Sequence, residues 1–336
     1  MAQINKPTDY FNTKLYTGNG STQSITGVGF QPDWVWLKDR TSAYNHVVFD
    51  KVRGVEKRIF PNLTNAEDTA ADTLTAFNSD GFAIGSNVGI NTNTNNYVSW
   101  NWLADNTSGS SNTDGSITST VSANTTSGFS IVSWTGSGAN ATIGHGLSTT
   151  PSMIIAKSRS ASGGWYTYHK SIGATKFLQL STTDASATNS TIWNNTEPTS
   201  SFFSTGTAFD NGTTYIAYCF AEVKGFSKFS SYVGNGSTDG AFVYTGFKPK
   251  LVIVKEYGAT GNWIMKESRF DNQNDSYILA NASDAEASGS VVGFDLLSNG
   301  FKLRGTAGDS NGAGADILYM AFAEEPLVGD NPATAR

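Results

Sequence analysis

The feature that most constrains this 336-residue chain is that it carries one pattern three times. Each copy begins with an aromatic residue and a glycine-rich turn, at residues 16–20, 134–138 and 232–236. In every copy a proline precedes a lysine by six positions, and eight further residues lead to His46, Trp165 or Trp263. Each copy closes on an aromatic strand, so that the proline lies 70, 69 and 73 residues before the last ring (32 to 102, 151 to 220 and 249 to 322). Three anchors with so little drift indicate a structural repeat.

The composition indicates that the repeat is built from β-strands. Charged residues make up only 15% of the chain, against about 25% in an average soluble domain, and Ser, Thr, Asn and Gly take their place. These residues suit strands with hydroxyl side chains outside and tight turns between them. Aromatic residues reach 12%, which supplies apolar area for a core and argues against disorder. We therefore predict an all-β protein of three tandem β-sandwich, jelly-roll-like domains with few short helical turns.

Local patterns predict individual strands and turns. The apolar, β-branched run after each proline, such as residues 251–255, is typical of a strand buried on both faces. Asp-Gly at 80–81 and Asn-Gly at 299–300 predict tight hairpins in the first and third copies. The second copy has residues 198–202 at this place, so its hairpin is expected to differ.

Two alanine-rich segments, 65–72 and 283–287, predict one helical turn each. At about 95 residues, each copy is long enough to close a core of its own. The chain is therefore expected to be a string of domains rather than a thin solenoid.

The connecting segments differ in character. The stretch between the first two copies is rich in Ser, Thr, Asn and Gly, which is typical of a flexible linker, whereas residues 222–226 join the second and third copies tightly. The predicted organisation is an N-terminal arm (1–13), domain 1 (14–104), a linker (105–115), domain 2 (116–223), domain 3 (224–326) and a C-terminal tail (327–336).

Charge and cysteine content exclude several classes of protein. The formal net charge is −6 without a cluster of Lys or Arg, which disfavours nucleic-acid binding. Cys219 is the only cysteine, so no disulfide can form within the chain, and a buried thiol is expected. No stretch reaches the ~18–20 apolar residues of a membrane helix, and the first residues lack the apolar core of a signal peptide. We therefore expect folding in a cytoplasm.

The histidines offer no readable catalytic arrangement. The chain has three, His46, His145 and His169, and none stands beside a Ser or Cys nucleophile motif or an orienting carboxylate. Structural or surface roles are therefore expected for all three. The glycine-rich turns are not followed by a helix or a Walker lysine, which argues against phosphate binding.

Metal sites and carboxylate pairs are equally weak. Residues 91–95 and 271–275 alternate oxygen ligands as calcium loops do, but the first has no acidic residue and neither has the terminal Glu that gives affinity. The acidic residues Glu67, Asp68 and Asp72 are expected on a solvated surface turn rather than in a glycosidase cleft. The sequence thus predicts no catalytic residue, no cofactor and no metal site.

The tryptophans remain as candidates for binding. In Trp34-Val35-Trp36 and Trp100-Asn101-Trp102 two rings share one strand face, which favours core packing. Trp193, by contrast, stands in a polar loop with Asn194 and Asn195. We predict that these three residues contact a host glycan or a partner chain, with the ring stacked on a sugar.

Several segments resemble a repeat domain of virion proteins from marine tailed bacteriophages, including phages of cyanobacteria and other abundant ocean bacteria. The resemblance covers almost the whole chain and is carried by residues 6–13, 15–20, 28–33, 77–82 and 321–324. It implies a structural virion protein of the tail-fibre type, and it carries no catalytic residues.

This resemblance leads to a functional expectation. The chain is expected to be a tail fibre or tail-associated adhesin that contacts the host surface, and not an enzyme. The expected partners are other virion proteins, further copies in a homo-oligomer (a trimer), and a host-surface glycan; nucleic acid and membrane insertion are not expected. A capsid decoration or head-fibre protein is the alternative, and a polysaccharide depolymerase is a third, weaker one.

Overall fold

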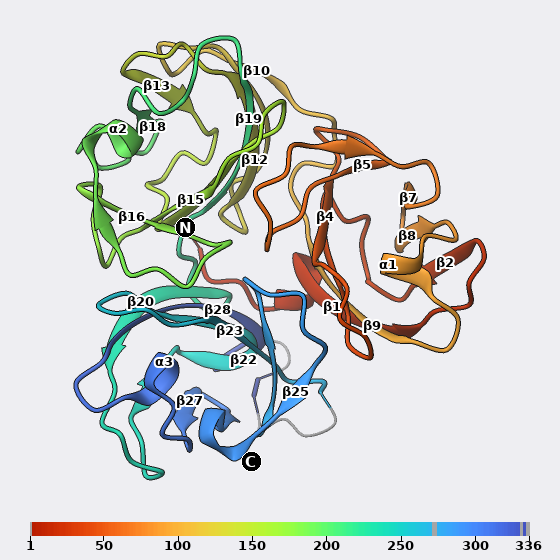
Figure 1. Cartoon of the computed structure of the whole chain (residues 1–336), viewed down its shortest axis with the longest axis vertical. Helices are drawn as coiled ribbons and strands as arrows, with labels where there is room; N and C mark the ends of the chain where they lie inside the picture. The colour runs from red at the N-terminus through yellow and green to blue at the C-terminus, as the bar shows by residue number, and fades with distance from the viewer. Residues whose placement is uncertain (1, 271–273, 330–331, 334–336) are drawn as a thin grey trace.

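The computed structural model describes residues 2–270, 274–329 and 332–333. The three repeats form three lobes around a common centre (Figure 1). The predicted all-β sandwich fold is confirmed, because the sheets are antiparallel and each described helix is a single turn.

Each repeat contains one main antiparallel sheet, and four consecutive strands of it have the same order in all three. Repeat 1 has the order β1 (Phe11–Thr17), β9 (Asn96–Trp102), β3 (Trp34–Asp39), β4 (Val47–Asp50). Repeat 2 has the order β12 (Phe129–Thr135), β19 (Thr214–Phe220), β14 (Met153–Ser158), β15 (Trp165–His169), continued by β16 (Lys176–Gln179) and β17 (Ala187–Thr188). Repeat 3 has the order β20 (Ser227–Val233), β28 (Asp316–Pro326), β22 (Phe247–Glu256), β23 (Trp263–Glu267), continued by β24 (Ser276–Leu279) and β25 (Ala287–Ser288).

A small second sheet completes each sandwich. It consists of β2 (Gln23–Thr26), β8 (Gly81–Ile84) and β7 (Leu74–Asn78) in repeat 1, β13 (Ala141–Gly144) and β18 (Phe202–Thr205) in repeat 2, and β21 (Phe242–Tyr244), β27 (Gly300–Leu303) and β26 (Phe294–Leu297) in repeat 3. The two predicted hairpins are confirmed as β7–β8 and β26–β27. Repeat 2 lacks this hairpin, as its different turn sequence predicted.

The predicted helical turns are wrong in position. Segments 65–72 and 283–287 instead contain the short strands β6 (Asp68–Thr69) and β25, because their backbones pair with β5 (Lys57–Arg58) and β24. The described helical turns lie elsewhere, at η1 (Pro7–Asp9), α1 (Val88–Asn91), α2 (Ser190–Trp193), η2 (Ser290–Val292) and α3 (Gly308–Asn311).

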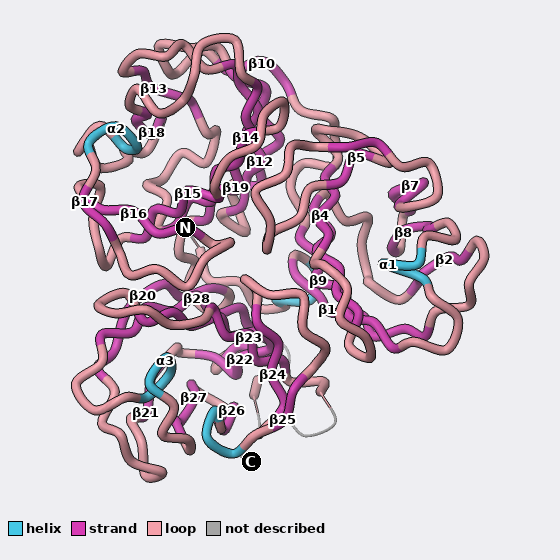
Figure 2. The backbone as a smooth tube through the Cα atoms, viewed as in Figure 1, coloured by secondary structure: helices cyan, strands magenta, loops and turns pink. Residues whose placement is uncertain are grey.

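Both faces are buried along β3, β14 and β22, the strands that follow the prolines, as the continuous apolar runs predicted. Along β3, Trp34 and Trp36 face a core at the centre of the molecule, whereas Val35 and Leu37 face the small sheet of the same repeat. The other two repeats alternate in the same way, so one central core is shared by all three and each repeat adds a private one. The strands of the main sheets line this centre, with α1 and α2 farther out in their lobes (Figure 2).

This shared core corrects the expectation of a string of separate domains, although each copy also has a core of its own. The largest buried rings, Trp34, Trp36, Trp100 and Trp102, lie in the central core together with residues of the other two repeats. Trp34 stacks on Tyr218 of repeat 2 with 4.3 Å between ring centroids, and Phe11 lies 5.0 Å from Phe322 of repeat 3. The repeats are therefore parts of one folding unit rather than separate tandem domains.

The segment predicted as a flexible linker is also structured. Residues 105–115 contain β10 (Ser110–Asn112), which pairs with β11 (Ser119–Asn124) and so extends the main sheet of repeat 2. The Ala104 and Asn106 N–H groups donate to the buried carboxylate of Asp33 at 2.7 and 3.0 Å. Composition alone did not reveal these pairings, because Ser, Thr and Asn serve turns and edge strands as readily as linkers.

The N-terminal arm belongs to the fold from its fourth residue onward. Ile4 is buried and its N–H donates to the Lys224 carbonyl at 3.1 Å, between repeats 2 and 3. β1 begins at Phe11, inside the predicted arm, and Phe11 is fully buried in the central core. Of the predicted C-terminal tail, Leu327 and Val328 are exposed, and residues 330–331 and 334–336 lie outside the described part of the chain.

The repeated glycine-rich turn has a steric reason. A Cβ on Gly18 would overlap the Thr92 carbonyl oxygen, and its counterparts Gly136 and Gly234 face backbone carbonyls in the same way. Two residues later, Gly20 has φ of +70°, which L side chains rarely adopt. In repeat 1 the buried Asn91 side chain accepts a hydrogen bond from the Asn19 N–H at 2.9 Å, which holds this turn closed.

Candidate functional site

The segments that connect the repeats follow one geometry three times. We call residues 60–67, 179–186 and 279–286 the clasp segments; each lies against the lysine-bearing strand of the next repeat. In each case the repeated lysine donates from Nζ to a clasp carbonyl: Lys157 to Thr64 at 3.2 Å, Lys255 to Thr183 at 3.1 Å, and Lys38 to Ser283 at 3.2 Å. Repeat 1 thus clasps repeat 2, repeat 2 clasps repeat 3, and repeat 3 clasps repeat 1, so the ring closes.

The side chain eight residues after each lysine makes the second clasp contact. Trp165 Nε1 donates to the Phe60 and Leu63 carbonyls at 2.9 and 3.1 Å, and Trp263 Nε1 donates to the Gln179 carbonyl at 3.0 Å. His46 takes this role in repeat 1, with Nε2 3.0 Å from the Leu279 carbonyl. The anchors that revealed the repeat in the sequence are therefore the residues that join the repeats.

The histidines serve structural contacts. Trp36 Nε1 donates to His46 Nδ1 at 2.8 Å, which leaves the proton of the neutral ring on Nε2 for the Leu279 carbonyl. His169 and His145 follow the same pattern, each accepting a backbone N–H at Nδ1 and facing a carbonyl with Nε2. Burial lowers the pKa of all three, to about 4 for His169, so they stay neutral near pH 7.

A second polar set lies at the end of β4, β15 and β23. Asp50, His169 and Glu267 occupy equivalent positions, and each contacts the neighbouring repeat. The Tyr218 hydroxyl donates to Asp50 at 2.8 Å, and Trp100 Nε1 donates to Glu267 at 3.0 Å. Burial raises the pKa of the Glu267 carboxyl to about 7, against the lowering effect of Lys250. These groups are sealed between repeats, so they hold the ring together and do not face solvent.

The acidic residues considered as a glycosidase pair are separated into different contacts. Glu67 accepts from Arg159 of repeat 2 at 3.0 and 3.1 Å, Asp68 pairs with Arg58, and Asp72 accepts from Asn87. Glu67 is therefore a partly buried bridge between repeats, which corrects its expected place on a solvated turn.

Neither oxygen-rich segment forms a metal-binding group in what is described. No group of three or more His, Cys, Asp or Glu side chains placed to share a metal ion occurs within 2–270, 274–329 and 332–333. In the first segment, Asn91 binds the glycine-rich turn, and Asn95 donates to Asp39 at 2.8 Å. Residues 271–273 of the second segment lie outside the described residues.

The predicted glycan contact at Trp193 is wrong. Trp193 is 1% exposed at the end of α2, and its ring packs edge-on against Tyr168 and Phe203 in the private core of repeat 2. Asn194 is partly exposed and Asn195 is exposed, and both have positive φ where the helical turn ends. A tryptophan among polar residues proved to be the apolar side of a one-turn helix, so its ring cannot stack on a sugar.

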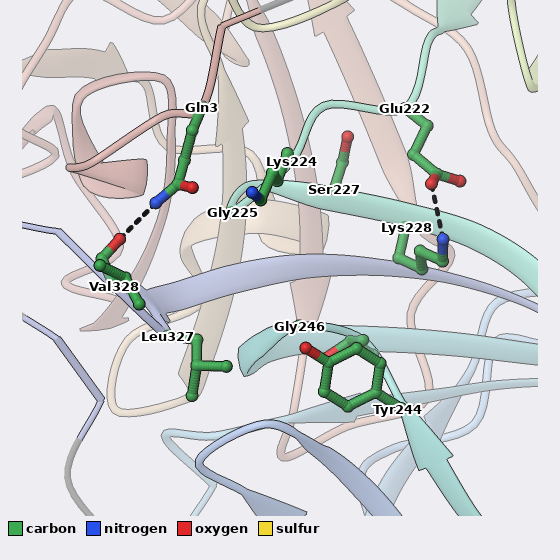
Figure 3. Close-up of a pocket in the computed structure, with 11 residues that line it drawn as sticks. Gln3, Glu222, Lys224, Gly225, Ser227, Lys228, Tyr244, Gly246, Leu327 and Val328 are labelled. Carbon is green, nitrogen blue, oxygen red and sulfur yellow. Dashed lines mark hydrogen bonds and ion pairs between the residues drawn. The ribbon is translucent and has the colours of Figure 1, made fainter.

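A pocket of about 610 Å³ is the best candidate for binding an outside molecule. It opens where the N-terminal arm, the connector between repeats 2 and 3, and the end of β28 meet (Figure 3). Gln3 donates its side-chain amide to the Val328 carbonyl and so ties the two ends of the chain together along one wall.

The pocket has one apolar and one charged wall. Tyr244, Leu327 and Val328 line the apolar wall and are 57%, 39% and 68% exposed. The charged wall contains Lys224, Lys228 and Glu222. Such walls suit a ligand with an apolar face and polar groups opposite it.

The charge on the second wall is positive on balance. Lys228 donates to Glu222 at 2.6 Å, and Lys170, just outside the pocket, donates to the same carboxylate at 2.7 Å. Although partial burial opposes ionisation, these bonds hold the pKa of the Glu222 carboxyl below its usual value. One carboxylate thus faces two amines, and Lys224 adds a third positive charge at the pocket.

Sequence reasoning missed this pocket, because its walls come from four segments that are far apart in the chain. Two signals pointed toward it. The tight connector 222–226 was recognised as a fixed junction. Phe242 and Tyr244 are aromatic, whereas the equivalent positions of the other two repeats are Ser, Thr or Gly.

A smaller pocket of about 280 Å³ lies on the other side of the arm, lined by Lys6, Pro7, Lys250, Arg269 and Glu324 among others. Its charged groups are engaged: Lys250 lies 3.7 Å from Glu324, and Arg269 donates to the Thr13 carbonyl at 2.9 Å. It therefore offers less to a ligand than the larger pocket.

No helix in the described part of the chain has the length and hydropathy needed to span a membrane.

Comparisons with known proteins place the chain in a family. No curated protein matches the sequence. One family model does match, over residues 6–326, which includes all three repeats and the arm from Lys6 onward. The chain therefore belongs to the family of the domain of unknown function DUF7483.

Proposed function

We propose that the chain is a structural and binding protein of a phage virion, a tail fibre or tail-associated adhesin, and that it is not an enzyme. The proposal rests on one observation: the side chains that could do chemistry make structural contacts. His46, His169, the buried carboxylates and most tryptophans join the repeats into one closed ring, and the large pocket is left open to an outside partner. The resemblance to virion repeat domains supports the same role.

The ligand of the pocket is, in this proposal, a host-surface glycan. The Tyr244 ring offers an apolar face to a sugar, and the charged wall offers hydrogen bonds to hydroxyl or acidic groups. The balance of two pocket lysines against one carboxylate favours a saccharide that carries a negative charge.

Two measurements test the proposal. Cryo-electron microscopy of particles that contain the chain is expected to show its density at the tail, with the pocket facing outward. The purified chain is expected to bind host cells, and Lys224→Glu is expected to weaken this binding at least tenfold. Ser24→Lys, an exposed change in repeat 1, serves as the control and should bind as the original chain does.

A capsid decoration or head-fibre protein is the alternative role. The near-threefold arrangement of the repeats supports it, because such a body can sit on a threefold position of a shell (Figure 1). Density tiled over the head would decide for this role. Release of reducing ends from host polysaccharide would instead support a depolymerase.

A further inference from the structure

The outer strand of the small sheet in repeat 3 exposes two aromatic rings. Among the described strands, β21 is paired with β27 on one side and with none on the other. Val243 lies opposite Phe301 and is buried in the private core of repeat 3. By strand alternation Phe242 and Tyr244 point to the opposite face, where they are 46% and 57% exposed.

The equivalent strands of the other repeats carry no such rings. Pairing with Phe82, Phe203 and Phe301 aligns Ile25, Ile143 and Val243 as the buried central residues. The flanking residues are Ser24 and Thr26 in repeat 1, Thr142 and Gly144 in repeat 2, and Phe242 and Tyr244 in repeat 3. Two repeats have small or polar residues at these flanking positions, whereas repeat 3 has two exposed rings. This difference indicates that the edge of β21 has a partner.

In repeat 2 the equivalent edge, that of β13, is partly covered by another backbone segment. The Ile117 N–H donates to the Thr142 carbonyl at 3.1 Å, and the Thr142 N–H donates to Ser116 Oγ at 2.9 Å. Ile117 forms a parallel bridge with Ile143. The covering residues belong to the insertion that carries β10 and β11. Repeat 3 is preceded only by the short connector 222–226, and no strand within residues 2–270, 274–329 and 332–333 pairs with the outer edge of β21.

The backbone of β21 is oriented for such pairing. The Leu303 N–H donates to the Ala241 carbonyl and the Thr245 N–H donates to the Asn299 carbonyl, both at 3.0 Å. Because backbone groups alternate in an antiparallel ladder, those of Phe242 and Tyr244 point to the open edge.

We propose that β21 pairs with β21 of a second copy of this chain, antiparallel and about a twofold axis at Val243. Phe242 then lies opposite Tyr244 of the second copy, and Tyr244 lies opposite its Phe242. Each of these two pairs exchanges two backbone hydrogen bonds, and the rings meet on one face of a continuous sheet.

A second copy fits this edge because the edge is self-complementary. The twofold axis places Phe242 of each copy opposite Tyr244 of the other, and such cross-strand aromatic pairs stabilise a sheet. Continuing the register, Ala241 lies opposite Thr245 and Gly240 opposite Gly246, so no charge faces a like charge. This inference concerns assembly and does not depend on the proposed role in a virion. It uses the Tyr244 ring that also lines the large pocket, so the second copy and a glycan are alternative partners of that ring.

The first test is the mass of the full chain in solution. Sedimentation at rising concentration is expected to show a species of about twice the 35.7 kDa of one chain. The variant Phe242→Ser with Tyr244→Thr installs the residues of repeat 1 and is expected to stay a single chain with an unchanged melting temperature. Val88→Ser removes an equally exposed apolar residue from repeat 1 and is expected to leave the dimer intact.

The second test fixes the register. A mixture of Phe242→Cys chains and Tyr244→Cys chains is expected to form an interchain disulfide on mild oxidation, since directly opposite residues lie about 5.5 Å apart. Each variant alone is expected to remain uncrosslinked, because identical residues lie about 7–8 Å apart on the diagonal. Cys219 is buried and does not interfere.

Three results would overturn the proposal. The first is a single-chain mass at every concentration together with no cross-link in the mixture, which would leave the edge to a different protein or to a segment of the same chain. The second is a dimer that persists in the Ser/Thr variant. The third is cross-linking within either single-variant sample, because it requires another register.

Discussion

At the scale of single residues, the molecule is organised by a few side chains that recur at equivalent places with different chemistry. Asp50, His169 and Glu267 end equivalent strands, and each reaches the next repeat through a different kind of hydrogen bond. His46 replaces the tryptophan of the other two clasp contacts and keeps the same donor role. The geometry of the contact is thus conserved inside the chain although the residue is not.

Glu267 gives stability a pH dependence whose sign can be stated. Its folded-state pKa of about 7 lies above the ordinary value of 4.5, so the folded state keeps a proton that the unfolded state has lost between these limits. The free energy of unfolding therefore falls, through this group, as pH rises from about 4.5 to 7. Glu267→Gln keeps an acceptor for Thr13 and Trp100 without the charge. We expect it to gain on the order of 3 kcal/mol relative to the original chain between pH 5 and pH 8.

Urea unfolding of both chains at pH 5, 6, 7 and 8 measures this difference. Only the difference between the chains is informative, because Asp33, with a pKa raised to about 6, and His169 titrate in the same region. Parallel curves for the two chains would show that Glu267 is ionised in the folded state throughout.

Gly18 tests the steric account of the repeated turn. Gly18→Ala sets a Cβ against the Thr92 carbonyl, which is backbone and cannot move aside. We expect a loss of about 2–3 kcal/mol in thermal or urea unfolding. Gly308→Ala is the matched control, because nothing lies within 4 Å of its Cβ and alanine favours the helical turn, so stability should stay equal or rise. Equal effects of the two changes would contradict the account.

At the scale of elements, the clasp segments join the repeats, a role that their sequence did not predict. They contain little regular structure, and two were expected to form helical turns. Their backbone carbonyls instead accept from the lysine and the ring N–H of the next repeat. Backbone groups that would be costly to bury alone are thereby satisfied by a neighbouring repeat.

Trp165→Phe measures the worth of one clasp contact. The change keeps an aromatic ring but removes the N–H that serves the Phe60 and Leu63 carbonyls. We expect a loss of about 1–3 kcal/mol beyond the packing cost. Trp34→Phe supplies the packing cost alone, because the Trp34 ring lies in the same central core and its N–H has no partner within the described residues. Equal losses in the two variants would mean that the clasp hydrogen bonds add nothing.

At the scale of the whole molecule, three sheets share one core and close into a ring. Each main sheet turns one face to the centre, so a repeat taken alone would expose that face to water. The interfaces run from repeat 1 to 2, from 2 to 3 and from 3 back to 1, as in a cyclic trimer of separate chains. The trimer expected between chains remains a prediction, and an approximate threefold arrangement already exists inside one chain.

This architecture predicts cooperative unfolding. We expect calorimetry of the full chain to show one transition. Residues 14–104 expressed alone are expected not to fold stably, because Trp34, Trp36, Trp100 and Trp102 would lose their cover and only the small private core would remain. Dye binding to exposed apolar surface and the absence of a melting transition would register this. Three resolved transitions, or a stably folded single repeat, would contradict the shared-core account.

Much of the local structure could be predicted, because it depends on neighbours in sequence. Alternating and continuous apolar runs, Asp-Gly and Asn-Gly turns and the spacing of Pro, Lys and aromatic residues identified the strands, two hairpins and the three repeats. Predictions failed where a segment's environment came from residues outside that segment. Segments 65–72 and 283–287 read as helical turns, the linker read as flexible, and Trp193 read as exposed.

The sequence by itself determined that this is a β-protein of three copies, because strand periodicity and turn chemistry are written in local spacing. Only the tertiary structure decided how the copies meet, which face of each sheet joins the central core, and where a pocket remains. Those outcomes depend on contacts between residues roughly a hundred or more positions apart, such as Lys157 with Thr64 and Trp100 with Glu267. The spacing of Lys and Trp is compatible with a core within one repeat and with an interface between repeats. The interface forms because closing the ring covers the apolar face of every main sheet.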